Sequence, residues 1–580
     1  MKKLLTLAAL TSCSLTLLAE KKEIVFEPTE SYGTKKQNTS DTPAVFDAEL
    51  FNDLFNNANN LFRAGHYDEA ATTYRKALAL SPNCAHTHFN LAQALYWAKN
   101  YELALESYKK TVNLQPDHPH AYAQIGKLLC DVKHYNEALY PLKKALQINP
   151  YAIEPRLLLV RIYNNNQMYD DALITLQDGL NLDPQDINLN FELANTYNTI
   201  NRLDEALALY QALDKRAPNN PSITYNIAYT LKKLGLVAES IPYYNKALAI
   251  NPDHSDAQFS RGLAYLVMGD FEKGFEGYEW RYHKPEQGSL RNFTEPRWNG
   301  EDLNNQIILI HSEQGLGDTF QFIRYAQLLK EKYPTVTVIA AVQKPTVDLL
   351  KLCPYIDTVV AVNAEELPAF DFQAPIMSLP YIMQTRINTV PNTIPYLFAN
   401  PQLVQEWKEK LSADKNFKIG ICWQGNDNYA TPQLRTAVAL KSVQAEQFGP
   451  ICKVPGVSVY SLQKTTGTDQ LTNLPDDIKI ISFDGDFDQS NGRFMDTAAV
   501  MRNLDLVITV DTSISHLAAA LGVPTWIMLP NPADWRWMIN RNDSPWYPQV
   551  TRLFKQPTPG DWTTMINEVA QELQKHLAQQ

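Results

Sequence analysis

The chain has 580 residues, more than one hydrophobic core usually serves, so its length predicts roughly three or four domains. Apolar residues make up 45% and charged residues 20%, with 22 Gly and 35 Pro, which excludes collagen-like, low-complexity and wholly disordered chains. The 52 basic and 63 acidic side chains give a net charge of −11, so nucleic acid is not expected as a partner.

The first 19 residues are patterned as a signal-like leader. Lys2 and Lys3 precede a run of 16 mainly apolar residues from Leu4 to Ala19, which is short for a membrane span. Leu10-Thr11-Ser12-Cys13 resembles a lipobox, so cleavage after Ala19 and lipidation of Cys13 both remain open. The leader predicts a periplasmic or envelope protein, or one held at the cytoplasmic side of the inner membrane if the leader stays uncleaved. It is the only membrane attachment that we expect, and residues 20–50 form a polar linker.

A 34-residue period follows the linker. Taking the periodic proline as position 32 divides residues 51–288 into seven units, and proline ends the second helix of a unit because it has no N–H to donate. Small residues at positions 8 and 20 predict that two antiparallel helices pack closely, with a large side chain at position 24 between them. The prolines are Pro82, Pro116, Pro150, Pro184, Pro218 and Pro252.

These positions resemble the tetratricopeptide repeat. The resemblance implies a helical solenoid whose inner groove binds a protein or peptide partner, and the alternative is a spacer or oligomerisation module. Position 6 is mostly polar, and similar asparagine ladders occur in O-linked N-acetylglucosamine transferases. Whether it contacts a peptide or is simply an exposed polar position stays open. Its residues are Asn56, Asn90, Gln124, Leu158, Glu192, Asn226 and Ser260.

After a polar linker over residues 289–300, short apolar runs alternate with amphipathic helices, which predicts parallel α/β structure. We expect an N-terminal lobe over 301–400, a C-terminal lobe over 416–556 and a terminal helix over 557–580. In the first lobe a strand, Ile307 to Ile310, leads through Gly315, Gly317 and Asp318 into a helix. A glycine loop before a helix N-terminus suits an anion or a carboxylate.

Polar residues also follow the predicted strands of the second lobe. One strand runs from Lys418 into a loop that contains Gln424 and reaches Arg435, and another, Val457 to Leu462, is followed by Lys464. The strand Leu506 to Val510 leads into a turn from Asp511 to His516, followed by a small-residue helix. Ligands bind outside the carboxyl ends of such strands, and the hydroxyls of Thr512, Ser513 and Ser515 predict a diphosphate cradle, hence a nucleotide.

Four motifs between residues 299 and 555 resemble the ADP-heptose heptosyltransferase family. They are Gly315-Leu316-Gly317-Asp318, Trp423-Gln424-Gly425-Asn426 with Arg435, Asp496-Thr497-Ala498-Ala499, and Asp511-Thr512-x-x-x-His516-Leu517-Ala518.

The resemblance implies two Rossmann-like lobes of the GT-B type, with the acceptor on the N-terminal lobe and a nucleotide sugar on the C-terminal lobe. It implies that Asp318 is the catalytic base, that Arg435 binds the donor phosphate, and that Asp511, Thr512 and His516 form the donor turn. Ser513 departs from the family, which usually has glycine there. Gly315, Gly317, Gln424, Lys464 and Ser513 complete the expected nucleotide-sugar site.

The implied activity is an inverting glycosyl transfer that needs no metal and no cofactor besides the donor substrate. Asp318 would take the proton of an acceptor hydroxyl, while Arg435 and the helix beginning near Ser513 stabilise the departing diphosphate. Asp484-Gly485-Asp486 imitates a D-x-D metal motif, but Asp-Gly pairs are ordinary turn formers.

The same residues have structural interpretations. Asp318 could cap its helix, His516 could be a buried histidine and Arg435 could form a surface ion pair, while Trp535, Trp537, Trp546 and Tyr547 are expected to pack. An exported enzyme would find no nucleotide sugar, so the leader and the catalytic hypothesis oppose each other. The alternative function is therefore a non-catalytic envelope scaffold whose repeats bind partners and whose transferase domain is degenerate.

Overall fold

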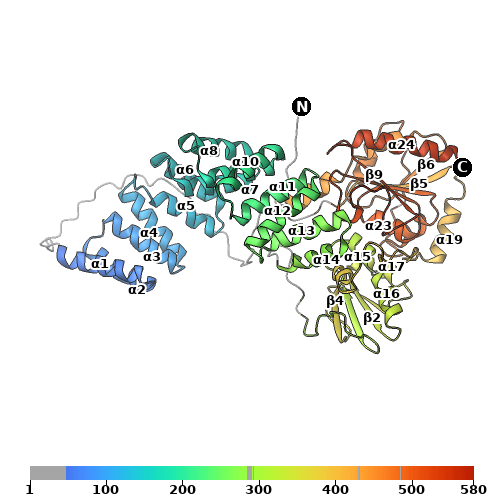
Figure 1. Ribbon diagram of the computed structural model, residues 1–580, viewed down its shortest axis with the longest axis horizontal. Coiled ribbons are helices and arrows are strands. Elements are labelled where there is room, and N and C mark those ends of the chain that lie inside the picture. The colour runs from blue at the N-terminus through green and yellow to red at the C-terminus, as the bar shows by residue number, and fades with distance from the viewer. Residues whose placement is uncertain are drawn as a thin grey trace. The chain divides into compact units, whose positions relative to one another are not determined.

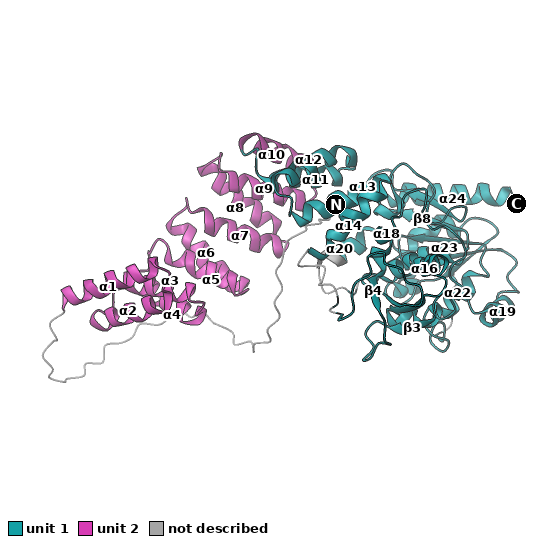
Figure 2. Ribbon diagram, turned by 60° about the horizontal axis from the view of Figure 1, so that its bottom comes forward, with its two compact units in different colours: residues 1–14, 217–580 teal, residues 15–216 magenta. Residues whose placement is uncertain are grey.

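The computed structural model describes residues 47–283, 291, 293–426, 428, 432–483 and 485–579, without the side chains of 432–434. The predicted leader over 1–19, with Cys13, lies outside the described residues, as do Asp484 and positions 289, 290 and 292 of the linker over 289–300. The described chain forms two compact units, residues 47–216 and the residues from Ala217 onward (Figure 2). Within these ranges, no helix has the length and apolar character required to cross a membrane.

The first part of the chain is a run of antiparallel helical hairpins, drawn from blue to green in Figure 1. Its helices pair as the 34-residue period predicts. They are α1 (Ala48–Arg63), α2 (Tyr67–Leu80), α3 (Ala85–Trp97), α4 (Tyr101–Leu114), α5 (Ala121–Asp131), α6 (Tyr135–Ile148), α7 (Ile153–Asn165), α8 (Tyr169–Leu182), α9 (Ile187–Thr199), α10 (Leu203–Arg216), α11 (Pro221–Lys233), α12 (Val237–Ile250), α13 (Ser255–Met268) and α14 (Phe271–Tyr278), followed by the 3-10 helix η1 (Glu279–His283).

The small and large repeat positions pack against each other as expected. A β-carbon added to Gly126 at position 8 would lie 2.4 Å from Cδ2 of Leu142 at position 24. Position 8 therefore makes room for the large side chain of the facing helix. Each second helix that precedes a periodic proline ends two residues before it, as α2 does at Leu80 before Pro82. The proline stop inferred from the sequence is thus present in the structure.

The turn within each repeat uses one left-handed residue, at position 15. It is glycine in three repeats, where a positive φ costs little, and a residue with a side chain in four. These residues are Gly65, Lys99, Lys133, Gln167, Asn201, Gly235 and Gly269.

The N-terminal lobe contains a four-stranded parallel sheet in the order β3-β2-β1-β4. The end of the segment predicted as a linker joins this sheet, because Trp298 is fully buried and its backbone N–H donates to the Gln373 carbonyl at 2.8 Å. The elements are β1 (Ile307–His311), α15 (Leu316–Phe322), α16 (Tyr325–Lys332), β2 (Thr337–Val342), η2 (Lys344–Thr346), α17 (Val347–Leu350), β3 (Thr358–Ala361), β4 (Phe372–Pro375), η3 (Ile376–Ser378) and α18 (Leu379–Ile382).

The C-terminal lobe contains a five-stranded parallel sheet in the order β6-β5-β7-β8-β9. In register, Ile421 of β5 lies beside Ser461 of β6 and Ile508 of β7, so the strands end together. The elements are α19 (Pro401–Lys410), β5 (Phe417–Cys422), α20 (Pro432–Leu440), η4 (Ala445–Phe448), α21 (Gly449–Cys452), β6 (Val457–Ser461), η5 (Thr468–Asn473), α22 (Met495–Met501), β7 (Leu506–Val510), α23 (Ser513–Ala520), β8 (Thr525–Leu529), η6 (Trp535–Trp537), β9 (Thr551–Lys555) and α24 (Trp562–Ala578).

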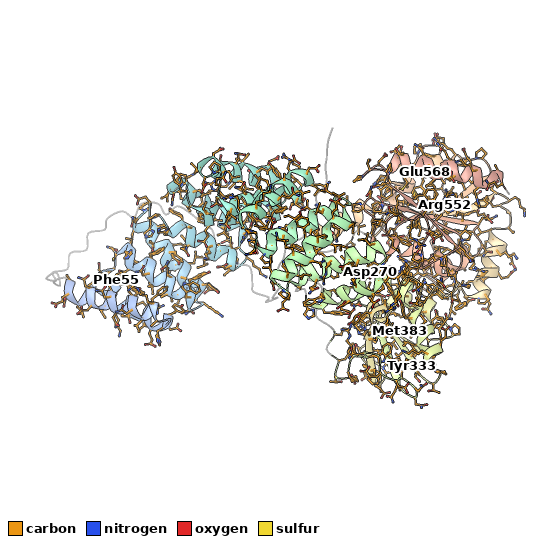
Figure 3. All side chains as sticks on the ribbon, in the orientation of Figure 1. Phe55, Asp270, Tyr333, Met383, Arg552 and Glu568 are labelled. Atoms are coloured by element: carbon orange, nitrogen blue, oxygen red, sulfur yellow. The ribbon has the colours of Figure 1, made fainter. Side chains whose placement is uncertain are left out.

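The architecture confirms the predicted fold class, a helical solenoid followed by two parallel α/β lobes. In Figure 3, Tyr333 and Met383 mark the first lobe, and Arg552 and Glu568 mark the second. One structural difference concerns α23. The sequence suggested a turn through His516, whereas the helix already begins at Ser513. Consequently, the predicted turn residues Ser513 to His516 form the first helical turn.

Candidate active site

A cavity of about 430 Å³, with both charged and apolar side chains in its wall, lies where the carboxyl ends of both sheets meet. The loops after β1, β5, β6, β7 and β8 supply its walls, as the rule for parallel sheets predicts. In the second sheet, the strand order reverses between β5 and β7, and the loops after these two strands both contribute. The N-terminal lobe contributes Gln314, Gly315, Leu316, Gly317, Asp318 and Gln343.

The cavity brings together most of the residues expected from the sequence. Those that line it are Gly315, Gly317, Asp318, Gln424, Lys464, Asp511, Thr512, Ser513 and His516. Arg435 is placed differently: it is exposed on α20 and is not among the lining residues. The basic residue that reaches the cavity from this segment is Lys441, directly after the end of α20.

Asp318 is both a helix-capping residue and a member of the cavity wall. Its Oδ2 accepts a hydrogen bond from the Gly315 backbone N–H at 2.7 Å, and its Oδ1 accepts one from Arg536 Nη2 at 2.6 Å. The expected structural role, capping of α15, is therefore real. Each carboxylate oxygen retains a further lone pair, so these two bonds leave Asp318 able to accept a proton.

Arg536 is the principal cation beside Asp318, and the sequence interpretation did not assign it to the site. Its Nη1 donates to Asp534 Oδ1 at 2.7 Å, and its guanidinium lies 4.4 Å from the centroid of the Trp535 ring. Burial acts to lower the pKa of Arg536, but Asp534 and Asp318 outweigh it and raise the pKa above its usual range. Arg536 therefore stays positively charged at any physiological pH.

A second pair of opposite charges lies at the end of β7. Lys441 Nζ is 3.8 Å from Asp511 Oδ2, and this carboxylate raises the pKa of Lys441. Burial raises the pKa of Asp511, and Lys441 opposes that shift. Arg493 and Lys464 add two further cations to the wall.

The N-terminus of α23 opens onto the same cavity. Its N-cap residue, Thr512, makes no side-chain capping hydrogen bond, although Ser515 Oγ donates to the Thr512 carbonyl at 2.6 Å. Ser513 has no positive φ, so the backbone here does not require the glycine that the heptosyltransferases usually have. The first amides of α23 and its dipole thus favour an anion in the cavity.

His516 is neutral and firmly held. Its ring stacks on Trp537 with centroids 5.2 Å apart, and its Nδ1 lies 2.8 Å from the Tyr547 hydroxyl. Burial, followed by the charge of Arg536, holds the pKa of His516 well below its usual range. As a neutral imidazole it can give or accept one hydrogen bond towards the cavity, but it does not act as a cation.

The Asp496 motif lies behind the cavity wall. Asp496 accepts hydrogen bonds from Trp407 Nε1 at 2.8 Å and from the Asp488 backbone N–H at 2.9 Å. Asp488 in turn accepts from the Thr497 backbone N–H at 3.0 Å. This closed set of bonds fixes the loop that carries Arg493 and Phe494 to the cavity.

The aromatic residues near residue 540 pack, as the sequence predicts. Trp535, Trp537, Trp546 and Tyr547 are all buried, and Trp546 stacks on Phe271 with centroids 5.7 Å apart. Among the described residues, no group of three or more His, Cys, Asp or Glu side chains is arranged to hold a metal ion.

Comparison with known protein families matches several repeat segments and one glycosyltransferase segment of this chain. Sequence models of the tetratricopeptide repeat match residues 55–119, 131–190 and 222–254. The model of glycosyltransferase family 9 (heptosyltransferase) matches residues 493–528, which include α22, β7 and α23. The expected combination of tetratricopeptide repeats with a heptosyltransferase-like domain is thus confirmed.

One curated relative and two solved structures illustrate the similarity. Protein FlbA of Caulobacter vibrioides is 25% identical over 328 residues, which cover 50% of this chain and 51% of FlbA, so the match spans about half of that relative. A solved structure of the tetratricopeptide repeat protein YrrB, described as having an unusual peptide-binding site, is 25% identical to this chain, with a TM-score of 0.30. The match covers 33% of this chain and all of YrrB. A solved structure of a family 9 glycosyl transferase from Veillonella parvula is 12% identical to this chain, with a TM-score of 0.35. The match covers 48% of this chain and 98% of that structure.

Sequence reasoning missed Lys441, Arg493, Asp534 and Arg536. Arg536 stands among tryptophans, for which the sequence favours packing over sugar stacking. Its position shortly after a strand of the parallel sheet was the available signal, because loops at that sheet edge supply ligand-binding groups. Lys441 lies about one helix length beyond the strand end, and the sequence does not show that this helix returns to the cavity.

Proposed function

We propose that the cavity binds the diphosphate of a nucleotide sugar and transfers the sugar, with inversion, to an acceptor hydroxyl. The observation that carries this proposal is the position of Asp318 in one cavity with the α23 N-terminus, Lys441 and Arg536. A carboxylate beside a set of anion-binding groups is the arrangement that an inverting transfer needs.

The charges of the cavity favour a diphosphate. The lining side chains carry four positive and three negative charges, a net charge of +1, from Lys441, Lys464, Arg493 and Arg536 and from Asp318, Asp511 and Asp534. The α23 dipole adds a partial positive charge at the same place. We assign the role expected for Arg435 to Lys441 and Arg536, since these two residues line the cavity and Arg435 does not.

The transfer step follows from these positions. The acceptor oxygen gives its proton to Asp318 and forms a bond to the anomeric carbon, while the bond from that carbon to the donor phosphate oxygen breaks. The electron pair of the broken bond stays on the diphosphate, whose added charge lies near Arg536, Lys441 and the α23 amides. The proposal uses the nucleotide sugar as a substrate and no further cofactor.

The repeat array fits a protein or peptide partner in this proposal. Asn90, Gln124 and Glu192 of the position-6 series are half-buried, and some already bond within the array, as Asn90 does to Asn59 at 3.2 Å. A bound partner would therefore contact polar side chains, some of which are already held in place by hydrogen bonds within the array.

Nucleotide binding by the full chain tests the proposal. We expect isothermal titration calorimetry to show binding of ADP or UDP, and Lys441→Gln to weaken it about 10-fold, the loss of one charged contact. Lys453→Gln is the matched control, since Lys453 pairs with Asp477 on the exposed surface of the same lobe. If ADP and UDP neither bind nor shift the melting temperature, the enzyme proposal fails and the scaffold alternative stands.

A further inference from the structure

The last repeat hairpin, α13–α14 with η1, shares a hydrophobic core with both lobes. Phe259, Leu266, Phe271, Phe275 and Tyr278 belong to the same buried cluster as β1 and η6. The backbone N–H of Ile539 also donates to the Val267 carbonyl at 3.1 Å. This hairpin is thus built into the domain that contains the cavity.

We propose that Tyr278, on this hairpin, is a positioning residue that holds the Asp318 loop and the Arg536 loop in register. The inference rests on the proposed function of the cavity. It extends that function to the repeat array, because one repeat then forms part of the support of the active site.

The Tyr278 hydroxyl bonds directly to the first cavity loop. Gln314 Nε2 donates to it at 3.0 Å, and the hydroxyl lies 3.2 Å from Gln314 Oε1. Gln314 lines the cavity four residues before Asp318. The loop between them is short, so fixing Gln314 also limits where the α15 N-terminus and Asp318 can lie.

The ring of the same tyrosine packs against the second cavity loop. Its centroid is 5.9 Å from that of Trp535, the residue next to Arg536, and Phe275 meets Trp535 edge-on at 5.8 Å. Tyr278 therefore contacts one residue in each of the two loops that lead to the Asp318–Arg536 ion pair.

Arg281 strengthens this connection one turn further on. It is 1% exposed, and its Nε and Nη2 donate to the two carboxylate oxygens of Glu313 at 3.1 and 2.9 Å. Nη2 also donates to Ser378 Oγ at 2.7 Å. A bidentate buried pair allows little movement, so Glu313 and Gln314 are both anchored to the end of the repeat array.

In two of the preceding repeats, the tyrosine at position 24 bonds within its own repeat. Tyr74 and Tyr210 occupy the same position, and each donates at 2.6 Å to an asparagine at position 9 of its own repeat, Asn59 or Asn195. In the last repeat position 9 is Leu263, which has no acceptor. The hydroxyl of Tyr278 is thus available to a residue outside the array.

Hydrogen exchange of the full chain tests the inference. We expect Tyr278→Phe to speed amide exchange in residues 313–318 at least about fivefold, because the loop loses its anchor. Gln314→Leu removes the same bond from the other side and is expected to give the same result. Tyr210→Phe, which removes an equivalent hydroxyl bonded within its own repeat, is expected to leave residues 313–318 unchanged.

A second measurement separates positioning from general stability. When ADP or UDP binds the wild-type chain, we expect amide exchange to slow in both residues 313–318 and residues 511–516. In Tyr278→Phe, the nucleotide should slow exchange in residues 511–516 but no longer in residues 313–318. If neither nucleotide changes exchange in either segment, the proposed function fails, and the nucleotide-free comparison still decides the role of Tyr278. Wild-type exchange of 313–318 in Tyr278→Phe would overturn the inference.

Discussion

Asp318 and Arg536 form an ion pair inside the cavity, with Oδ1 and Nη2 2.6 Å apart. In Asp318→Asn, an isosteric amide replaces the carboxylate and the net charge of the lining side chains rises from +1 to +2. Arg536 is then less neutralised, so we expect ADP or UDP to bind about 3- to 10-fold more tightly. Turnover of the nucleotide sugar should fall about 100-fold or more, since the base is lost.

Calorimetry and a donor-turnover assay measure the two effects separately. Asp543→Asn is the matched control, because Asp543 also pairs with an arginine, Arg541, at 2.7 Å, but on the exposed surface. Full turnover in Asp318→Asn would remove Asp318 from the role of base. Weakened nucleotide binding in Asp318→Asn would instead show that the ion pair mainly holds Arg536 in position, and that Asp318 does not oppose nucleotide binding by neutralising its charge.

Individual site residues could be predicted where a motif and a strand end coincide. Asp511 and Thr512 follow one predicted strand directly, Gly317 and Asp318 follow another across the glycine loop, and all four line the cavity. Arg435 and Lys441 show the limit. Both follow β5 at some distance, and only the course of α20 decides which one faces the cavity. That course depends on packing between elements, which a local pattern does not contain.

At the scale of elements, the two lobes meet where α15 and α23 begin. A β-carbon on Gly317 would lie 2.9 Å from His516 Cδ2 and 3.5 Å from Ser513 Cα. Gly317→Ala should therefore push the two helices apart, costing about 1–3 kcal/mol of the free energy of unfolding and weakening nucleotide binding. Urea denaturation and calorimetry measure both quantities.

Gly315→Ala is the control, at the N-cap of the same helix, α15. Its added β-carbon would meet only Asp318 Oδ2, at 3.3 Å, and the φ of Gly315 is −71°, which alanine adopts freely. We expect a clearly smaller loss of stability than in Gly317→Ala. Equal losses would mean that the α15–α23 contact is not what makes Gly317 necessary.

The elements of the repeats were the most predictable part of the fold. The proline period and the small residues fix where helices end and meet, since both act over a few neighbouring residues. The left-handed turn at position 15 was less visible. Lys99, Lys133 and Gln167 adopt it although their side chains give no signal for positive φ. There the packing of the two helices imposes the turn, at a modest local cost.

For the whole molecule, the compact unit that holds the cavity begins at Ala217, inside the predicted repeat array. The sequence separates the repeats from the lobes at residues 289–300, because the helical period ends there. Period alone does not reveal that α14 turns Phe271 and Phe275 towards Trp535 and Trp546. Asp270 caps α14 at the start of this contact (Figure 3).

Two truncated chains test where the folding unit begins. A fragment of residues 217–580 keeps the whole shared core, whereas one of residues 294–580 loses the buried rings of Phe259, Phe271, Phe275 and Tyr278. Removing one buried aromatic ring from a packed core costs about 3–5 kcal/mol of the free energy of unfolding, so the second fragment should not reach a stable fold.

Calorimetric unfolding and binding of a hydrophobic dye distinguish the two fragments. We expect one cooperative transition for residues 217–580, and strong dye binding without a transition for residues 294–580. A cooperative transition of the shorter fragment at the same temperature would show that the lobes fold without the last hairpin, and that the shared core joins two independent domains.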